Sequence, residues 1–180
     1  MARTEIRFAG FGGQGLLLAG IMLGKAACML AGKYASQTQT YGSAARGGAS
    51  QCNVVIDDVP LTYVGVVHPD AYLCMSQEAY DMFIDDLKEG GKVFYDKDLV
   101  KIKDIPGATQ YPIPATTEAI NIFGKKIVAN MVILGALVEG TGVLETDIVK
   151  QCIRENVPKG TEDLNIQAFD EGRRLYKEVA

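Results

Sequence analysis

A glycine-rich turn between two apolar segments constrains the fold of this chain more than any other feature. The turn covers residues 10–15, with the sequence GFGGQG. Apolar residues before it predict a short strand at 5–9, and apolar residues after it predict a helix at 15–31. Glycine lets the backbone approach a ligand closely, and the first turn of a helix presents N–H groups without partners. The segment therefore predicts the first unit of an α/β fold, with an anion site at the turn.

The charge around this turn differs from that of the rest of the chain. The protein has 180 residues, 22 of them acidic, and a net charge of −4, yet no Asp or Glu lies between Ile6 and Ile56. The basic residues in that segment are Arg7, Lys25, Lys33 and Arg46. We interpret it as a mildly basic third of an acidic protein, suited to a phosphate or carboxylate. The negative net charge and the lack of long Lys/Arg clusters argue against nucleic-acid binding.

The pattern along the chain alternates between strands and helices. After the first unit we predict strands at 33–37 and 50–57, then a turn at 57–60 from which 61–66 returns as a hairpin. Strands at 71–75 and 92–95 flank a helix at 77–89 that Ser76 caps, and a weaker strand pattern lies at 109–111. Helices follow at 116–124, 126–139, 145–156 and from 161 or 162 onwards. We predict one domain over residues 1–180, a three-layer helix–sheet–helix α/β sandwich with a mostly parallel, mixed sheet and a helical C-terminal third.

Cysteine spacing and hydropathy bear on whether the chain binds a metal cluster or a membrane. Cys28, Cys52, Cys74 and Cys152 lie far apart without a C-x-x-C pair, which disfavours an iron–sulfur or zinc site and predicts reduced, mostly buried thiols in a cytoplasmic protein. Residues 15–31 look like a membrane span, but Lys25 interrupts the run, and the stretch before it falls short of the ~20 residues that a span needs. We therefore expect a buried helix and no membrane association.

The glycine turn fits the dinucleotide fingerprint G-x-G-x-x-G through Gly10, Gly12 and Gly15. The full fingerprint also needs an acidic residue at the end of the second strand to bind a ribose hydroxyl. The sequence QTQ stands there instead, at 37–39, so NAD or FAD binding is disfavoured. Alternatively, the glycines serve only tight strand–helix packing. Gln14 weighs against that alternative, because packing alone does not call for an amide.

A second candidate segment is QTQTYGSAARGGAS, residues 37–50. Arg46 has no acidic residue nearby, and a guanidinium can bind phosphate or carboxylate through two hydrogen bonds. The structural alternatives are an internal salt bridge or a capped carbonyl for Arg46, and a packed ring with a hydrogen-bonded hydroxyl for Tyr41. Because open α/β sheets bind ligands at the carboxyl ends of their strands, we predict one site from both segments. Its residues are Gly12, Gly13, Gln14, Gly15, Tyr41, Gly42, Arg46, Gly47 and Gly48.

Residues with catalytic chemistry are scarce. His68 is the only histidine, and HPD at 68–70 indicates a turn. The sequence has no nucleophile elbow, no H-E-x-x-H and no P-loop ending after the glycines. Asn130 lies in a very apolar helical pattern, so its amide needs a partner, either within the protein or on a ligand. The residues alone predict a binding domain without a catalytic group or metal site of its own.

Three motifs together resemble a known family. They are FAGFGGQG at 8–15, QTQTYGSAARGGAS at 37–50 and KIVANMVILGAL at 126–137. In order and spacing they resemble the gamma subunits of 2-oxoacid:ferredoxin oxidoreductases, and the second motif looks most like the 2-oxoglutarate and branched-chain 2-oxoacid members. The likeness covers essentially the whole chain. It departs at Ser43 and Ala44, where the family usually has Pro-Glu.

This resemblance implies a division of labour. Partner subunits would carry thiamine diphosphate and the iron–sulfur clusters, and the complex would convert a 2-oxoacid, with 2-oxoglutarate favoured, and coenzyme A to acyl-CoA, carbon dioxide and reduced ferredoxin. The gamma-type chain would be inactive alone and would help to bind the phosphates of coenzyme A in a shared site. Two alternatives stay open: a purely structural assembly subunit, and a free-standing nucleotide-binding oxidoreductase.

Overall fold

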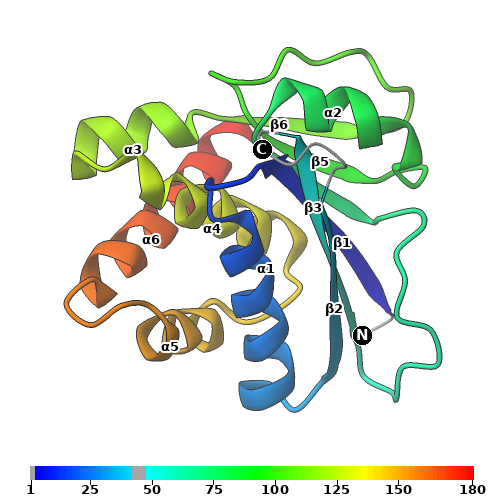
Figure 1. Cartoon of the computed structure of the whole chain (residues 1–180), viewed down its shortest axis with the longest axis horizontal. Helices are drawn as coiled ribbons and strands as arrows, with labels where there is room; N and C mark the ends of the chain where they lie inside the picture. The colour runs from blue at the N-terminus through cyan, green and yellow to red at the C-terminus, as the bar shows by residue number, and fades with distance from the viewer. Residues whose placement is uncertain (1–2, 42–47) are drawn as a thin grey trace.

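A single mixed sheet forms the centre of the fold in the computed structural model, which describes residues 3–41 and 48–180, with Tyr41 described by its backbone only. Its six strands lie in the order β2-β3-β1-β4-β5-β6 (Figure 1). β3 is antiparallel to β1 and β2, whereas β4, β5 and β6 continue parallel to β1. The strands are β1 (Thr4–Phe11), β2 (Tyr34–Tyr41), β3 (Ala49–Asp57), β4 (Ala71–Cys74), β5 (Lys92–Asp96) and β6 (Thr109–Ile113).

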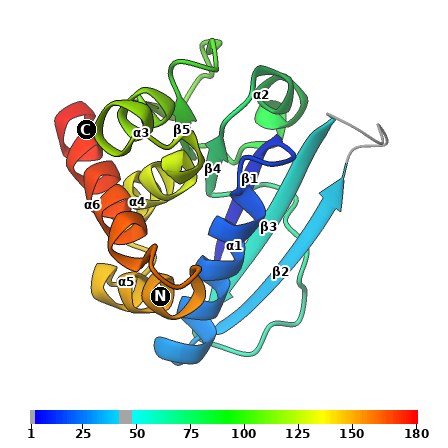
Figure 2. The same ribbon diagram turned by 60° about the vertical axis from the view of Figure 1, so that its left-hand side comes forward.

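Helices cover both faces of this sheet. α2 lies on one face, while α1 and the C-terminal helices lie on the other (Figures 1 and 2). The helices are α1 (Leu16–Lys25), α2 (Gln77–Phe83), α3 (Ala115–Phe123), α4 (Ala129–Thr141), α5 (Thr146–Asn156) and α6 (Glu162–Val179). A π-helical turn, Ala26–Leu30, extends α1, and 3-10 turns at Ile84–Asp86 and Lys126–Val128 follow α2 and precede α4. The predicted α/β sandwich with a mostly parallel sheet and a helical last third is confirmed. Across the described residues, no helix has the length and apolar character needed to cross a membrane.

The two faces of the sheet bury separate cores. Phe8, Leu73 and Phe94 point into the larger core, which α4 fills because nearly all of its residues are buried. Tyr72 and Val93 point into the smaller core beneath α2. Strands covered on both sides read as apolar runs instead of alternating patterns, as β4 does with all four residues buried.

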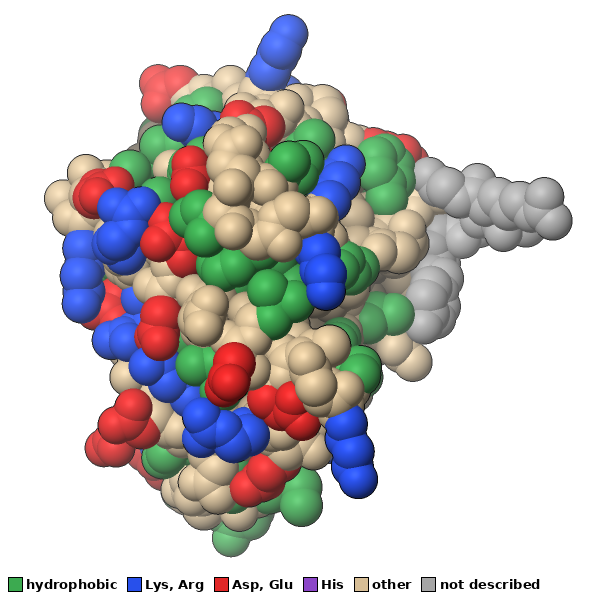
Figure 3. All heavy atoms as spheres, turned by 90° about the vertical axis from the view of Figure 1, so that its left-hand side faces the viewer, with side chains coloured by type: hydrophobic (Ala, Val, Ile, Leu, Met, Phe, Trp, Pro, Cys, Tyr) green, Lys and Arg blue, Asp and Glu red, His purple; other side chains and the backbone are tan. Residues whose placement is uncertain are grey.

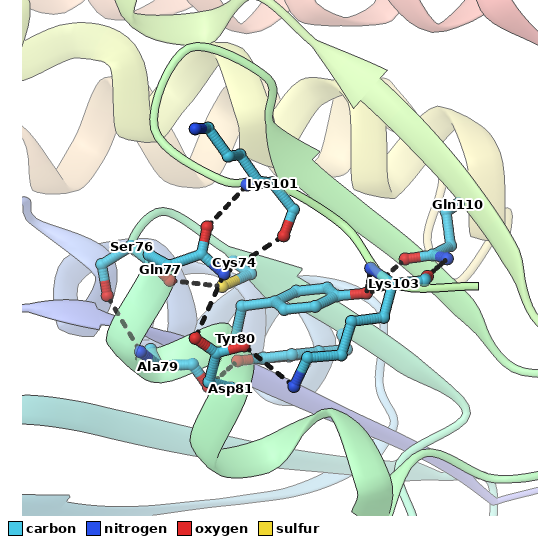
Figure 4. Close-up of polar contacts among 10 residues, drawn as sticks. Cys74, Ser76, Gln77, Ala79, Tyr80, Asp81, Lys101, Lys103 and Gln110 are labelled. Atoms are coloured by element: carbon cyan, nitrogen blue, oxygen red, sulfur yellow. Dashed lines mark hydrogen bonds and ion pairs between the residues drawn. The ribbon is translucent and has the colours of Figure 1, made fainter. Parts of the chain in front are cut away.

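Side chains of α2 hold the irregular segment 97–108 against the smaller core (Figure 4). Ser76 Oγ accepts a hydrogen bond from the N–H of Ala79 at 3.2 Å, the predicted cap. Gln77 binds the backbone of Lys101 twice, accepting from its N–H at 2.6 Å and donating to its carbonyl at 3.1 Å. The Tyr80 hydroxyl donates to Gln110 Oε1 at 2.8 Å. These bonds explain how a segment without secondary structure keeps its place.

The predicted hairpin was wrong in position. Residues 61–66 form no strand, and the hairpin partner of β3 is β2, which continues to Tyr41 instead of ending at residue 37. The turn after β3 leaves the sheet, and Arg3 holds the following segment by donating to the carbonyls of Tyr63 and Gly65 at 2.7 and 3.0 Å. The helix predicted at 77–89 is also shorter, because Leu87 leaves the helical conformation.

Candidate binding site at the glycine turn

The glycine turn lies between β1 and α1 at the carboxyl edge of the sheet. Gly13 and Gly15 have φ angles of +91° and +76°, a region that other residues rarely adopt. Gly15 is the N-cap of α1, and no side chain caps this helix end. The first N–H groups of α1 therefore have no partner within the helix and are available to an anion.

The side chain of Gln14 ties the turn to the neighbouring strand. Its Oε1 accepts from the N–H of Phe11 at 2.7 Å, and its Nε2 donates to the carbonyl of Met75, just after β4, at 2.7 Å. A Cβ atom at Gly10 would collide with this amide and would lie 2.6 Å from Leu16 Cδ1. Gln14 thus has a structural reason to be there, and the donors that the turn offers are its backbone N–H groups.

Asn130 fixes the other end of the turn. Its Nδ2, on the buried first turn of α4, donates to the carbonyl of Gly15 at 3.1 Å. Of the two roles the sequence left open for Asn130, the structure shows the one within the protein. Gln14 and Asn130 together hold the turn from opposite sides, so its shape is set before any ligand arrives.

A pocket of about 210 Å³ opens beside this turn. α1 follows β1 onto one face of the sheet and α2 follows β4 onto the other, so the pocket lies where neighbouring strands send their connections in opposite directions. Open α/β sheets bind ligands at such a point. Both polar and apolar side chains line the pocket, and none is acidic: Gly13, Gln14, Met75, Thr116, Lys126, Ile127 and Ala129.

Lys126 is the cation of this pocket, and the sequence analysis did not select it. The residue is exposed and takes part in no ion pair with any described residue. The sequence did contain two hints that Lys126 belongs to this site. Lys126 is the first residue of the third family motif, and helices that follow the outer strands also begin at the carboxyl edge of the sheet.

Arg7, Lys25 and Lys33, the described cations of the mildly basic third, all have partners within the fold. Arg7 is buried and donates to Asp86 at 2.5 Å, and Lys33 forms an ion pair with Asp58. Lys25 donates to Asn156 Oδ1 at 2.7 Å. The acidic partners of Arg7 and Lys33 come from outside residues 6–56, which is why counting charges along the sequence was misleading for these two cations.

The second predicted segment leaves the sheet at the same edge as the glycine turn. β3 lies between β1 and β2, with Phe11 opposite Ala49 and the Tyr41 backbone opposite Ser50. Gly48 directly precedes β3, whereas Gly42, Arg46 and Gly47 lie outside the described residues. A carboxylate approaches this edge from α2, where Glu78 accepts a long hydrogen bond of 3.4 Å from the N–H of Ala49.

The remaining reactive side chains offer little chemistry. His68 is exposed, with its Nδ1 3.0 Å from the carbonyl of Asp86. Three of the cysteines are buried, as predicted for most of them, and Cys28 is exposed. Burial raises the pKa of the Cys74 thiol to about 11, so it is protonated at neutral pH. Within 3–41 and 48–180, no three His, Cys, Asp or Glu residues gather as a metal site would require.

Comparisons with known proteins place the chain among oxidoreductase subunits. The sequence profile of the family described as pyruvate ferredoxin/flavodoxin oxidoreductase matches residues 5–175. The 2-oxoglutarate synthase subunit KorC of Methanocaldococcus jannaschii is 48% identical over 98% of this chain and 96% of its own length. The gamma subunit of a keto/oxoacid ferredoxin oxidoreductase from Geobacter sulfurreducens has the same fold, with a TM-score of 0.88 and 40% identity over 97% of this chain and 99% of that one.

A larger enzyme contains the same fold as one part of its chain. The structure of 2-oxoglutarate:ferredoxin oxidoreductase from Magnetococcus marinus, with 2-oxoglutarate, coenzyme A and succinyl-CoA bound, matches with a TM-score of 0.87 and 27% identity. The match covers 100% of this chain and 32% of that one.

The fold and the position of the pocket are those of an open α/β binding domain, and the comparisons identify the class as subunits of 2-oxoacid oxidoreductases. The chain belongs to the pyruvate ferredoxin/flavodoxin oxidoreductase family, as a gamma subunit of a multisubunit 2-oxoacid:ferredoxin oxidoreductase.

Proposed function

We propose that this gamma subunit serves a complex that oxidises 2-oxoglutarate with coenzyme A, and that its glycine turn holds an anionic part of coenzyme A. Its relative from Methanocaldococcus jannaschii is named as a subunit of 2-oxoglutarate synthase. The structure of the related Magnetococcus marinus enzyme has 2-oxoglutarate, coenzyme A and succinyl-CoA bound. Thiamine diphosphate, the iron–sulfur clusters and the contact with ferredoxin belong to partner subunits in this proposal.

The pocket beside the glycine turn carries the proposal. It combines the uncapped start of α1, the backbone of Gly13 and the cation of Lys126, with no acidic side chain in its lining. Phosphate groups bind to such helix starts because the N–H groups and the helix dipole both favour negative charge. Arg46 would add a second cation from the neighbouring connection.

The magnitudes indicate that a partner subunit completes the site. A helix N-terminus contributes about 0.3–2 kcal/mol to anion binding, and a charged hydrogen bond about 1.5–3 kcal/mol. These sums correspond to millimolar affinity at best, so the isolated chain should bind coenzyme A weakly. The surface around the pocket also suits a protein partner, because Phe11, Leu18 and Ile127 expose 38%, 37% and 57% of their area. Hydrophobic side chains gather at the centre of the face shown in Figure 3, with Lys and Arg beside them.

Two adjacent lysines provide the decisive test. Lys126 lines the pocket at the glycine turn, whereas Lys125, equally exposed, lines a different hollow. In the assembled complex, Lys126→Ala should raise KM for coenzyme A at least about tenfold and leave KM for the oxoacid unchanged, while Lys125→Ala should change neither. Arg46→Ala should act like Lys126→Ala. Equal effects of the two lysine variants would refute a phosphate site at this pocket.

Further measurements distinguish a shared coenzyme A site from a purely structural role and test the choice of oxoacid. Micromolar binding of coenzyme A to the isolated chain, measured by calorimetry, would contradict the shared site. A purely structural role would instead leave KM for coenzyme A unchanged in all three variants while weakening assembly. Assay of the purified native complex against a panel of oxoacids tests the preference for 2-oxoglutarate.

A further inference from the structure

The pocket at the glycine turn contains a second polar group that the proposed phosphate site does not use. Thr116, on the first turn of α3, lines the pocket together with Gly13 and Lys126. The residue is only 8% exposed, so its hydroxyl must find its hydrogen bonds inside the protein or on a ligand.

Asp96 fixes the direction of that hydroxyl. It ends β5, is 0% exposed, and accepts on Oδ2 both the Thr116 hydroxyl at 2.5 Å and the Thr116 N–H at 3.0 Å. The N–H of Asp98 donates to the other oxygen at 3.1 Å. Burial raises the pKa of the Asp96 carboxyl, and the three hydrogen bonds from Thr116 and Asp98 offset part of that rise. An ionised carboxylate only accepts hydrogen bonds, so the single proton of the Thr116 hydroxyl points at Asp96, 2.5 Å away.

The Thr116 oxygen can therefore only accept a hydrogen bond from a ligand in the pocket. Phosphate groups at neutral pH offer almost no donors, so the partner of Thr116 is not the phosphate that Gly13 and Lys126 would bind. Apart from Gln14, whose amide is bonded to the backbone of Phe11 and Met75, the rest of the lining is apolar, formed by Met75, Ile127 and Ala129. A ligand segment that suits these surroundings is largely aliphatic and carries an N–H group.

We propose that Thr116, oriented by Asp96, accepts a hydrogen bond from an amide N–H of the pantetheine arm of coenzyme A. This inference rests on the proposed coenzyme A site, and it assigns two sides of the pocket to two parts of the coenzyme. The cationic side binds the phosphates, and the Thr116 side recognises the neutral arm.

The test compares three variants of the assembled complex with two thiol substrates. Thr116→Val removes the acceptor and keeps the shape, Thr116→Ser keeps the acceptor, and Thr117→Val changes the exposed neighbour on the same turn. Pantetheine replaces coenzyme A as substrate, or as competitive inhibitor where its turnover is slow, because it has the arm but no phosphate. Thr116→Val should raise KM or Ki about three- to tenfold for both compounds, and the other two variants should stay within about twofold of wild type.

The outcomes separate this inference from the proposal beneath it. Lys126→Ala should weaken coenzyme A and leave pantetheine unchanged, whatever Thr116 does. If Thr116→Val weakens coenzyme A alone, or neither compound, the arm does not bind at Thr116, and the inference falls while the phosphate site can still stand.

A ligand-side measurement covers the case in which Thr116→Val does not assemble. Wild-type complex is tested with pantetheine analogues in which each amide N–H in turn is replaced by an ester oxygen. One replacement should weaken binding about three- to tenfold. Equal binding of all the analogues would overturn the inference.

Discussion

The crossing of α4 and α6 offers the sharpest test of how this fold is packed. Gly172 of α6 meets the backbone of α4 so closely that a Cβ atom there would overlap the carbonyl oxygen of Val132. It would also lie 2.6 Å from the carbonyl carbon of Val132 and 3.1 Å from the nitrogen of Ala136, where ordinary contacts begin at 3.4 Å. Backbone atoms cannot rotate away as a side chain can, so Gly172→Ala must push the two helices apart.

That separation sets the expected loss of stability. A gap of 0.5–1 Å already forfeits a quarter to a half of the dispersion energy of the atoms that face it, and overpacking a core costs about 1–3 kcal/mol or more. Alanine gains about 0.5–1 kcal/mol over glycine inside a helix, so a net loss of about 2 kcal/mol is expected for Gly172→Ala. A domain of this size should then melt about 4–8 °C lower, as circular dichroism would show.

The matched control is the same substitution in α1. A Cβ atom at Gly24 would meet only Val54 Cγ1 at 4.0 Å, which is ordinary contact. Gly24→Ala should therefore gain the helix preference of about 0.5–1 kcal/mol and melt about 1–4 °C higher. If both variants shift in the same direction, close backbone approach is not what the glycine in α6 provides.

Three further substitutions test single interactions. Gly15→Ala forces alanine to a φ of +76° and places its Cβ 3.2 Å from Asn130 Cγ, so urea unfolding should show a loss of about 2 kcal/mol and the complex a raised KM for coenzyme A. Arg173 holds the pKa of the Glu139 carboxyl below its usual range, so the contribution of this ion pair is complete above that range and is lost as the pH falls through the lowered value. Glu139→Gln should remove about 1 kcal/mol at neutral pH and flatten the acid side of the stability curve in urea titrations. Tyr80→Phe removes a hydroxyl with two partners and should cost about 1–3 kcal/mol, together with faster amide exchange in the segment it holds.

Local signals in the sequence predicted most of the fold. The glycine turn, the Ser76 cap and the apolar patterns located β1, α1, the start of α2 and the C-terminal helices to within a few residues. The hairpin was missed because the turn signals at 57–60 are strong, whereas β2 is polar along its second half and reads as a loop. Its pairing with β3 is a contact between segments, which no single segment's pattern can reveal.

The site was predictable only where its residues are adjacent in sequence. The turn at 10–15 could be found because consecutive glycines form it. Thr116 and Lys126 could not be joined to it by spacing, since the sheet order alone brings their helices to that edge. The charge count failed for a related reason. Arg7 and Lys33 are far in sequence from acidic partners that lie beside them in space.

In the proposed shared site, the part that this chain supplies is held in place before a ligand binds. Here the turn is bonded by Gln14 to β4 and by Asn130 to α4, and the Thr116 hydroxyl is bonded by Asp96. The side chains of Gln14, Asn130 and Thr116 are thus held by the fold itself, so binding would not have to order them. Such a site contributes to the binding of a substrate and not to the chemical step. For that reason, changes in this chain should alter KM for coenzyme A far more than kcat.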